Sequence, residues 1–420
     1  MRIILLYIDP GTGSMLFTIL LGISSALYFA IKLSFIKFKH KLLGGKIKLS
    51  DDKIPFVIFA ESKTYFNVFN PICRELDTFG KKILYITGSS DDPMLNNEYI
   101  NVDVEVIENQ NKLFAKLNLI KANILLSTTP GLDIHQWKKS KDVDYYVHIM
   151  HAANEIVTYK MFGIDYYDVI LLSGKYQEKD VRDLEKIRNL PKKELEIVGI
   201  PYLDELKRRK DATVKDIKNK NGEINVLLAP TWGDLGILSK YGSKMIDALI
   251  ATGYNITIRP HPQSFISEKK LIEGFINKYE NCSKVKWNKD RDNFDVLNSA
   301  DVMISDYSGV VFDYALVFNK PIIYTNPRLN YDKRDACWLK RPIWTESALP
   351  RLGIELTDER LLKMKETIDY VLHNDDFEKG RNEVKSEVWQ KEGEGAINVK
   401  NFLVEKYVKL STSVNFPCGS

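Results

Sequence analysis

The sequence predicts an α/β protein with two helix-covered parallel sheets, preceded by one membrane-spanning helix. Three observations lead to this prediction. Residues 15–31 carry no charge, and short apolar runs alternate with helical stretches from Pro55 onward. A second series of such runs begins after Glu223. Continuous apolar runs separated by helices are typical of parallel strands that are buried on both faces.

Length and composition fit a folded protein with two cores. The chain has 420 residues, of which 44% are hydrophobic and 28% charged, and this length exceeds that of one ordinary domain. The formal net charge is only +4, from 60 basic and 56 acidic residues, which argues against a dedicated nucleic-acid binder. The cysteines are far apart, so we expect neither a zinc site nor a disulfide framework.

The N-terminal segment, residues 1–48, is predicted to be a membrane anchor with a basic stem. Residues 15–36 are interrupted only by Lys32, and about 20 apolar residues suffice for one helical span. Five lysines follow within residues 37–48, against Arg2 alone before the span. The positive-inside rule therefore predicts a single-pass protein of the cytoplasmic (inner) membrane, with everything after residue 37 in the cytoplasm. A cleaved signal peptide, whose basic residues precede the apolar run, and a buried core helix are the alternatives.

The first series, residues 49–206, predicts a sheet of parallel strands, with a helix near residues 66–79. The expected strands are Phe56 to Ala60, Ile83 to Thr87, Ile124 to Ser127, Tyr145 to Met150 and Val169 to Leu172. Their β-branched and aromatic residues favour strands.

The second series, residues 207–355, begins after a basic, polar linker at residues 207–223. Its expected strands are Asn225 to Ala229, Asn255 to Arg259, Val285 to Trp287, Asp301 to Ser305 and Pro321 to Tyr324. Residues 356–420 read as helices that pack back on the body. We therefore expect two Rossmann-like domains with a cleft between them.

Three polar clusters each follow a strand of the second series, at residues 230–234, 259–262 and 305–309. The carboxyl ends of strands are where doubly wound sheets bind ligands, so these clusters are expected to converge. Each cluster alone also has a purely structural interpretation, as an N-cap or a turn. Their occurrence at three strand ends of one sheet favours a site.

The residue types in these clusters suit a nucleotide diphosphate. Ser308 and Gly309 open a helix, whose free N–H groups and dipole favour phosphate oxygens. Arg259 and His261 can supply positive charge or a proton to a diphosphate leaving group. Asp306 can orient one of these side chains or hold a ribose hydroxyl.

The first series contributes a candidate general base. His148 and His151 lie at the end of the strand that begins at Tyr145, and a histidine has a pKa near neutrality. Strand alternation puts these two side chains on opposite faces, so at most one is catalytic. We prefer His151, because it lies closer to the carboxyl end.

These clusters, in this order, resemble the CDP-glycerol glycerophosphotransferases, which make teichoic-acid-type polymers on the GT-B fold. The resemblance covers about residues 145–325. It is carried by Ala229-Pro230-Thr231-Trp232, by Arg259-Pro260-His261-Pro262, by the run from Ser305 to Ala315, and by Met150-His151-Ala152, where the family has Trp-His-Gly.

The resemblance implies transfer of glycerol phosphate, or a related polyol phosphate, from a CDP-linked donor. An acceptor hydroxyl, deprotonated by His151, attacks the β-phosphorus, and CMP leaves. The implied catalytic residues are His151 and His261, and the implied donor-binding residues are Thr231, Arg259, Ser305, Asp306, Ser308, Gly309 and Asp313.

The implied partners are CDP-glycerol or a related CDP-polyol, a lipid-linked glycan acceptor and the membrane. No paired-aspartate metal signature is present, so we expect no metal and no cofactor. Three other functions stay open: a nucleotide-sugar glycosyltransferase of the same fold, a related epimerase acting on UDP-sugars, and a catalytically inactive membrane scaffold.

Overall fold

The computed structural model describes residues 53–213, 223–290, 292–326, 331–374 and 376–413. Residues 53–420 form one compact unit. No helix within the described ranges is both long and apolar enough to cross a membrane. The predicted span at residues 15–36 lies outside those ranges.

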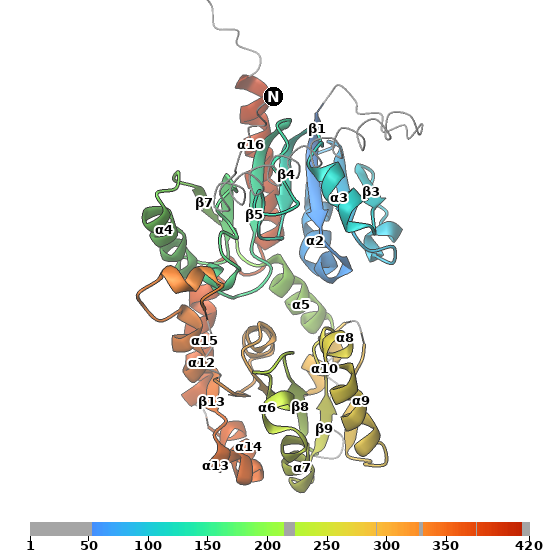
Figure 1. Cartoon of the computed structure of the whole chain (residues 1–420), viewed down its shortest axis with the longest axis vertical. Coiled ribbons are helices and arrows are strands. Elements are labelled where there is room, and N and C mark those ends of the chain that lie inside the picture. Colours follow the sequence, from blue (N-terminus) through green and yellow to red (C-terminus); the bar gives the residue numbers. More distant parts are fainter. Residues whose placement is uncertain (1–52, 214–222, 291, 327–330, 375, 414–420) are drawn as a thin grey trace, which may run out of the picture. The chain divides into compact units, whose positions relative to one another are not determined.

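The unit contains two sheets in which every strand pairing is parallel (Figure 1). The first has seven strands in the order β3-β2-β1-β4-β5-β6-β7, and the second has six in the order β10-β9-β8-β11-β12-β13. The strands are β1 Ile54–Ala60, β2 Ile83–Thr87, β3 Val102–Val106, β4 Ala122–Ser127, β5 Val143–Ile149, β6 Val169–Leu172, β7 Glu194–Ile197, β8 Asn225–Ala229, β9 Asn255–Ile258, β10 Val285–Trp287, β11 Val302–Ser305, β12 Ile322–Tyr324 and β13 Gly353–Glu355.

Helices connect the strands and cover both sheets. Those of the first half and the connection to the second are η1 Lys63–Tyr65, α2 Phe66–Asp77, η2 Pro93–Asn96, α3 Gln110–Leu117, η3 Ile156–Thr158, α4 Tyr176–Arg188 and α5 Pro201–Ala212. Those that follow are α6 Ile237–Tyr241, α7 Ser243–Ala251, α8 Ser264–Ser267, α9 Lys269–Lys278, α10 Phe294–Ser299, α11 Val310–Phe312, η4 Asp313–Val317, η5 Asp335–Trp338, α12 Trp344–Leu352, α13 Asp358–Leu362, α14 Met364–Leu372, α15 Asp376–Val388 and α16 Gly395–Ser413.

Both faces of each sheet are buried, as the apolar runs predict. Along β1, Val57 and Phe59 enter one core cluster, whereas Phe56 and Ile58 enter another. Successive strand residues point to opposite faces, so a strand that is covered on both sides has no polar alternation. The ten predicted strands and the two-sheet α/β architecture are confirmed.

Three strands were not predicted, and all three lie at sheet edges: β3, β7 and β13. β7 reads Glu-Leu-Glu-Ile, and both of its glutamates are exposed. An edge strand needs less apolar surface than a central one, so the continuous apolar run that identified the other strands is missing. The predicted linker also differs, because residues 207–212 complete α5.

Two segments connect the halves of the unit. α5 follows the first sheet, yet its Leu203 and Leu206 pack in a core cluster of the second. α16 follows the second half and packs on α2 and the first sheet (Figure 1). Asp204 of α5 joins the two connections, because its carboxylate accepts the indole N–H of Trp389 at 2.7 Å and the N–H of Gly395 at 2.8 Å.

Candidate active site

The order of the second sheet reverses between β8 and β11, the position at which doubly wound sheets bind ligands. Asp306, directly after β11, is buried there. Its carboxylate accepts the N–H of Thr231 at 2.9 and 3.0 Å and the N–H of Ile237 at 3.1 Å. Burial raises the pKa of Asp306 to about 6, although these N–H donors lower it. Asp306 therefore fixes the loop that follows β8.

Ser305 joins the ends of the same two strands. It is fully buried, and its hydroxyl donates to the carbonyl oxygen of Ala229 at 2.6 Å. Thr231 is half-buried at the start of the loop. Ser305 and Thr231 thus lie at the strand ends where the order of the sheet reverses. Their part in donor binding stays a prediction.

At Gly309 the first and second halves of the unit lie close together. Its φ of −57° is helical, so the backbone conformation does not require glycine. A Cβ at this position would lie 3.2 Å from Oδ1 of Asn154 and 3.7 Å from the Cβ of Ala152. The missing side chain thus admits the loop that follows His151. Oδ1 of Asn154 is buried and has no hydrogen-bond partner within the described residues.

Arg259 and His261 follow β9 at the same edge of the sheet. The guanidinium of Arg259 donates to Oδ1 of Asn288. Nδ1 of His261 accepts the N–H of Gln263 at 3.1 Å, and a neutral imidazole that accepts at Nδ1 carries its proton on Nε2. Desolvation, and then the charge of Arg259, lowers the pKa of His261. His261 can therefore donate a hydrogen bond from Nε2.

Asp313 lies one helical turn beyond Gly309, at the start of the π-helical segment η4. The residue is 6% exposed, and one of its carboxylate oxygens, Oδ1, has no partner among the described residues. Burial raises its pKa to about 7, and the hydroxyl of Tyr202 lowers it. A buried polar atom without a partner is rare in proteins, and a ligand that fills it is one explanation.

The two histidines of the first half have different environments. His151 is half-buried, with Nδ1 2.7 Å from the hydroxyl of Thr128 and its ring 5.2 Å from that of Tyr65. His148 is fully buried, with Nε2 3.1 Å from the hydroxyl of Tyr159. Burial lowers the pKa of His151 to about 4 and that of His148 to about 3. The structure therefore leaves His151 as the one with access to a ligand.

Glu155, four residues after His151, connects both halves. It is fully buried, and its carboxylate accepts the hydroxyl of Tyr307 at 3.1 Å and the hydroxyl of Thr345. Tyr307 belongs to the turn that contains Ser308, whereas Thr345 belongs to α12. Burial raises the pKa of Glu155, against the hydroxyl donors. One buried carboxylate thus joins the loop after His151 to the turn that contains Ser308.

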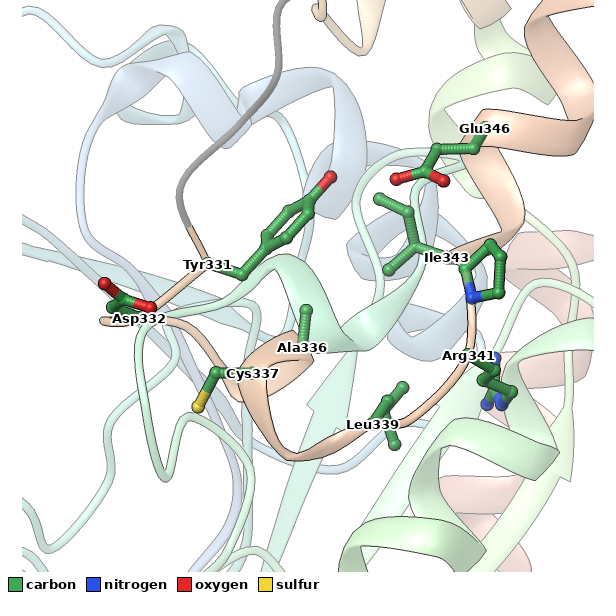
Figure 2. Close-up of a pocket in the computed structure, with 9 residues that line it drawn as sticks. Tyr331, Asp332, Ala336, Cys337, Leu339, Arg341, Ile343 and Glu346 are labelled. Atoms are coloured by element: carbon green, nitrogen blue, oxygen red, sulfur yellow. The ribbon is translucent and has the colours of Figure 1, made fainter.

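A cavity of about 390 Å³ lies beside this network (Figure 2). It is lined by Tyr331, whose hydroxyl interacts with that of Tyr307. Figure 2 shows Tyr331 and Glu346 on opposite sides of the cavity. The lining residue Arg341 is paired with Asp180 and Asp183 of α4.

The cavity-lining segment, residues 331–343, follows β12 but packs on the first half. Its Ala336 and Ile343 belong to a first-half core cluster. Asp335 is fully buried and accepts the N–H of Phe162 at 2.8 Å and the guanidinium of Arg188. A buried ion pair therefore holds this segment in place.

Sequence reasoning did not assign a role to Thr128, Asn154 or Glu155. The last two follow His151 directly, and that proximity is the only signal the sequence offers. In the described part of the chain, no group of three or more histidine, cysteine or acidic side chains could hold a metal ion.

The two doubly wound parallel sheets define a GT-B-like fold. A UDP-GlcNAc 2-epimerase from Methanocaldococcus jannaschii, in complex with UDP-GlcNAc and UDP, aligns with 84% of this chain and 100% of its own, at 12% identity and a TM-score of 0.53. A putative UDP-N-acetylglucosamine 2-epimerase from Listeria monocytogenes aligns with 86% and 98%, at 12% identity and a TM-score of 0.51. At such low identity these similarities establish the fold alone.

Two sequence comparisons point to one family. Residues 132–337, which contain every candidate site residue, match the family described as CDP-Glycerol:Poly(glycerophosphate) glycerophosphotransferase. The chain is also 26% identical over 132 residues to the Teichoic acid glycerol-phosphate primase of Bacillus subtilis (strain 168). That match spans 30% of this chain and about a third, 32%, of the primase. Both matches support the CDP-glycerol glycerophosphotransferase family.

Proposed function

We propose that this enzyme transfers glycerol phosphate, or a related polyol phosphate, from a CDP-linked donor to an acceptor hydroxyl. The acceptor oxygen forms a bond to the β-phosphorus. The bond from that phosphorus to the bridging oxygen breaks, and CMP leaves with the electron pair. Phosphoryl transfer of this kind depends mainly on positioning and on charge stabilisation.

His151 is the general base of this proposal. If Nδ1–H donates to the hydroxyl of Thr128, Nε2 has the free lone pair that accepts the proton of the acceptor. With its pKa lowered to about 4, His151 is neutral at physiological pH, which is the form that a base needs.

The donor is proposed to bind at the strand ends of the second sheet. His261, from Nε2, and Arg259 stabilise charge on the diphosphate, while Ser308 and Gly309 approach its oxygens. The unpartnered Oδ1 of Asp313 suits a hydroxyl of the donor ribose. Asp306 acts through the loop that it fixes.

The observation that carries the proposal is the approach of Asn154 to Gly309. It brings the loop of the proposed base next to the proposed diphosphate turn, with Oδ1 of Asn154 still able to accept a hydrogen bond. One reaction needs both half-sites within reach of each other.

The acceptor and the membrane are proposed from the sequence. The apolar run at residues 15–36 and the lysines after it are proposed to anchor the enzyme in the cytoplasmic membrane, with the catalytic part in the cytoplasm. A hydroxyl of a lipid-linked glycan or a cell-surface polymer is then the proposed acceptor.

The test is turnover of CDP-glycerol, CDP-ribitol and UDP-GlcNAc by the full chain, measured as nucleotide release and label transfer to membrane lipid extracts. We expect CMP release and transfer with a CDP-polyol. His151→Ala is expected to lower kcat by about 10²- to 10⁴-fold, the usual contribution of a general base, while CDP still binds.

The matched control is His135→Ala, because His135 is exposed and outside the proposed site. Preferential turnover of UDP-GlcNAc would contradict the proposal in favour of a glycosyltransferase or an epimerase. Full activity of His151→Ala would exclude His151 as the base.

A further inference from the structure

A second cavity, of about 250 Å³, lies between the end of α5, the π-helical segment η4 and α15. It adjoins Val317, at the opposite end of the α11–η4 helix from Gly309. It is therefore distinct from the candidate active site. Among its charged lining residues, four are basic, Lys207, Lys210, Arg381 and Lys385, and one, Asp211, is acidic.

Arg381 is a buried cation. The residue is 7% exposed, and its Nε donates to Oδ1 of Asn319 at 2.8 Å. Its Nη1 is buried and has no hydrogen-bond partner, and Arg381 forms no ion pair with any carboxylate in the described residues. A buried charge is normally paired, because removing it from water is costly. Burial accordingly lowers the pKa of Arg381, although the charge of Glu378 opposes this.

Lys210 is the second cation without an acidic partner among the described residues. Its Nζ donates to the carbonyl oxygen of Val317 at 2.7 Å. Burial lowers the pKa of Lys210, and the charges of Lys207 and Lys385 lower it further, against Asp211. Positive charge is thus crowded at this cavity, and an anion would relieve the repulsion.

The rim residues have partners, and these do not neutralise the interior. Lys207 pairs with Asp211 at 2.5 Å, and Lys385 pairs with Glu392 at 2.9 Å. Both pairs are partly exposed to solvent, and such pairs contribute little and rearrange readily. Arg381 and Lys210 are the two cations of the cavity that form no ion pair among the described residues.

We propose that this cavity is an anion site that binds a phosphate group, as a monoester or a diester. Arginine and lysine donors recognise phosphate oxygens strongly, and the planar guanidinium matches their geometry. The volume of about 250 Å³ is several times the ~30 Å³ share of one water molecule, which leaves room for phosphate and part of its ester. This site stands independently of the proposed transferase reaction.

A bound phosphate would brace α5 against α15. α5 supplies Lys210 and α15 supplies Arg381, so an anion held by both joins the two helices. These helices are already connected through Asp204 and Trp389. Binding is therefore expected to raise the thermal unfolding temperature of the full chain.

The test is titration of the full chain with inorganic phosphate and with glycerophosphoglycerol, a phosphodiester. Calorimetry measures the affinity for each probe, and thermal unfolding measures the change in unfolding temperature. Lys210→Met is expected to weaken binding of at least one probe by about 10- to 100-fold, the usual effect of losing a hydrogen bond to a charged group. The matched control is Lys244→Met, since Lys244 is exposed on α7 and outside the cavity; its effect should stay below about twofold.

A second variant, Lys385→Gln, keeps the test informative if Lys210→Met folds poorly, and it too should weaken binding. If the cavity variants weaken binding of inorganic phosphate alone, the ligand is a small anion. If they weaken binding of the diester, the ligand is a polymer-like phosphodiester. Equal affinities of wild type and both cavity variants for both probes would overturn the proposal.

Discussion

Two histidines only three positions apart behave as different chemical groups in this molecule. His148 packs its ring against Tyr159 and Tyr167, with centroids 5.4 and 4.9 Å away. His151 contacts Thr128 and has partial access to solvent. Strand alternation predicts that the two differ, but only the packing decides which one is fully enclosed.

The burial of His148 predicts a loss of stability in acid. Its pKa is lowered to about 3 in the folded chain, whereas an exposed histidine titrates near 6.5. Below pH 6.5 the unfolded chain binds the proton first, so the free energy of unfolding falls by up to about 1.4 kcal/mol per pH unit. His148→Phe should flatten this slope in urea unfolding between pH 7.5 and 5.

His135→Phe is the control for this experiment and should retain the slope. In the wild type, the contribution of His148 to the slope should fade above pH 6.5 and be nearly absent at about pH 8, where neither state is protonated. A variant with an unchanged acid slope would show that another group causes it.

At the scale of single elements, the sequence predicts central strands better than edge strands. Central strands such as β8 and β11 are continuous apolar runs, which have one simple interpretation. The edge strand β13 has three residues and is paired only with β12. Its strand character comes from tertiary pairing and leaves no local pattern in the sequence.

The candidate site was predictable only in part for a related reason. Polar clusters after strands are visible in the sequence, because topology alone brings them to one edge. The contact of Asn154 with Gly309 and that of Glu155 with Thr345 join residues more than 150 positions apart. Such pairings depend on the packing of two domains, which no local spacing encodes.

Because Glu155 accepts hydrogen bonds from Tyr307 and Thr345, we expect the loop after His151 to be coupled to the turn that contains Ser308. Glu155→Gln leaves one acceptor oxygen for two hydroxyl donors, and Tyr307→Phe removes one donor. We expect each variant to lose about 1–3 kcal/mol of stability and to lower kcat more than it raises the KM for the donor. The double variant should lose less than the sum, since both changes remove the same contact.

Thr345→Val is the comparison for this pair, because it removes the other hydroxyl donor and leaves the turn intact. Strict additivity of Glu155→Gln and Tyr307→Phe would show that the two residues act separately.

The segment 331–343 is expected to depend on its buried ion pair. Asp335→Asn leaves the guanidinium of Arg188, whose side chain is 5% exposed, without one of its two carboxylate partners. Breaking a buried pair typically costs about 3–5 kcal/mol, measurable by thermal or urea unfolding. The exposed Asp332→Asn on the same segment should cost less than about 1 kcal/mol. If both variants lose an equally small amount of stability, the core contacts of Ala336 and Ile343 are enough to hold the segment in place.

At the scale of the whole molecule, the N-terminal segment predicts where the enzyme is found. Removal of residues 1–52 deletes the apolar run and the lysines, and leaves the compact unit that begins at Lys53. We expect the full chain to sediment with membranes at high salt and the truncated chain to remain in the supernatant. Truncated protein that still sediments after a high-salt wash would show that the catalytic unit has a membrane affinity of its own.

The C-terminal helix also has a consequence for biosynthesis. The ring of Tyr407 in α16 lies 5.2 Å from that of Phe56 in β1 and 6.1 Å from that of Phe79. Val399 and Leu403 complete the same core cluster. A ribosome makes α16 after all the strands of the first sheet, so one face of that sheet is covered by α2 but not yet by α16 when it emerges. We expect a nascent chain stalled before α16 to bind a hydrophobic dye and to resist proteolysis poorly. Emergence of α16 would then complete the core of the part of the protein that is made first.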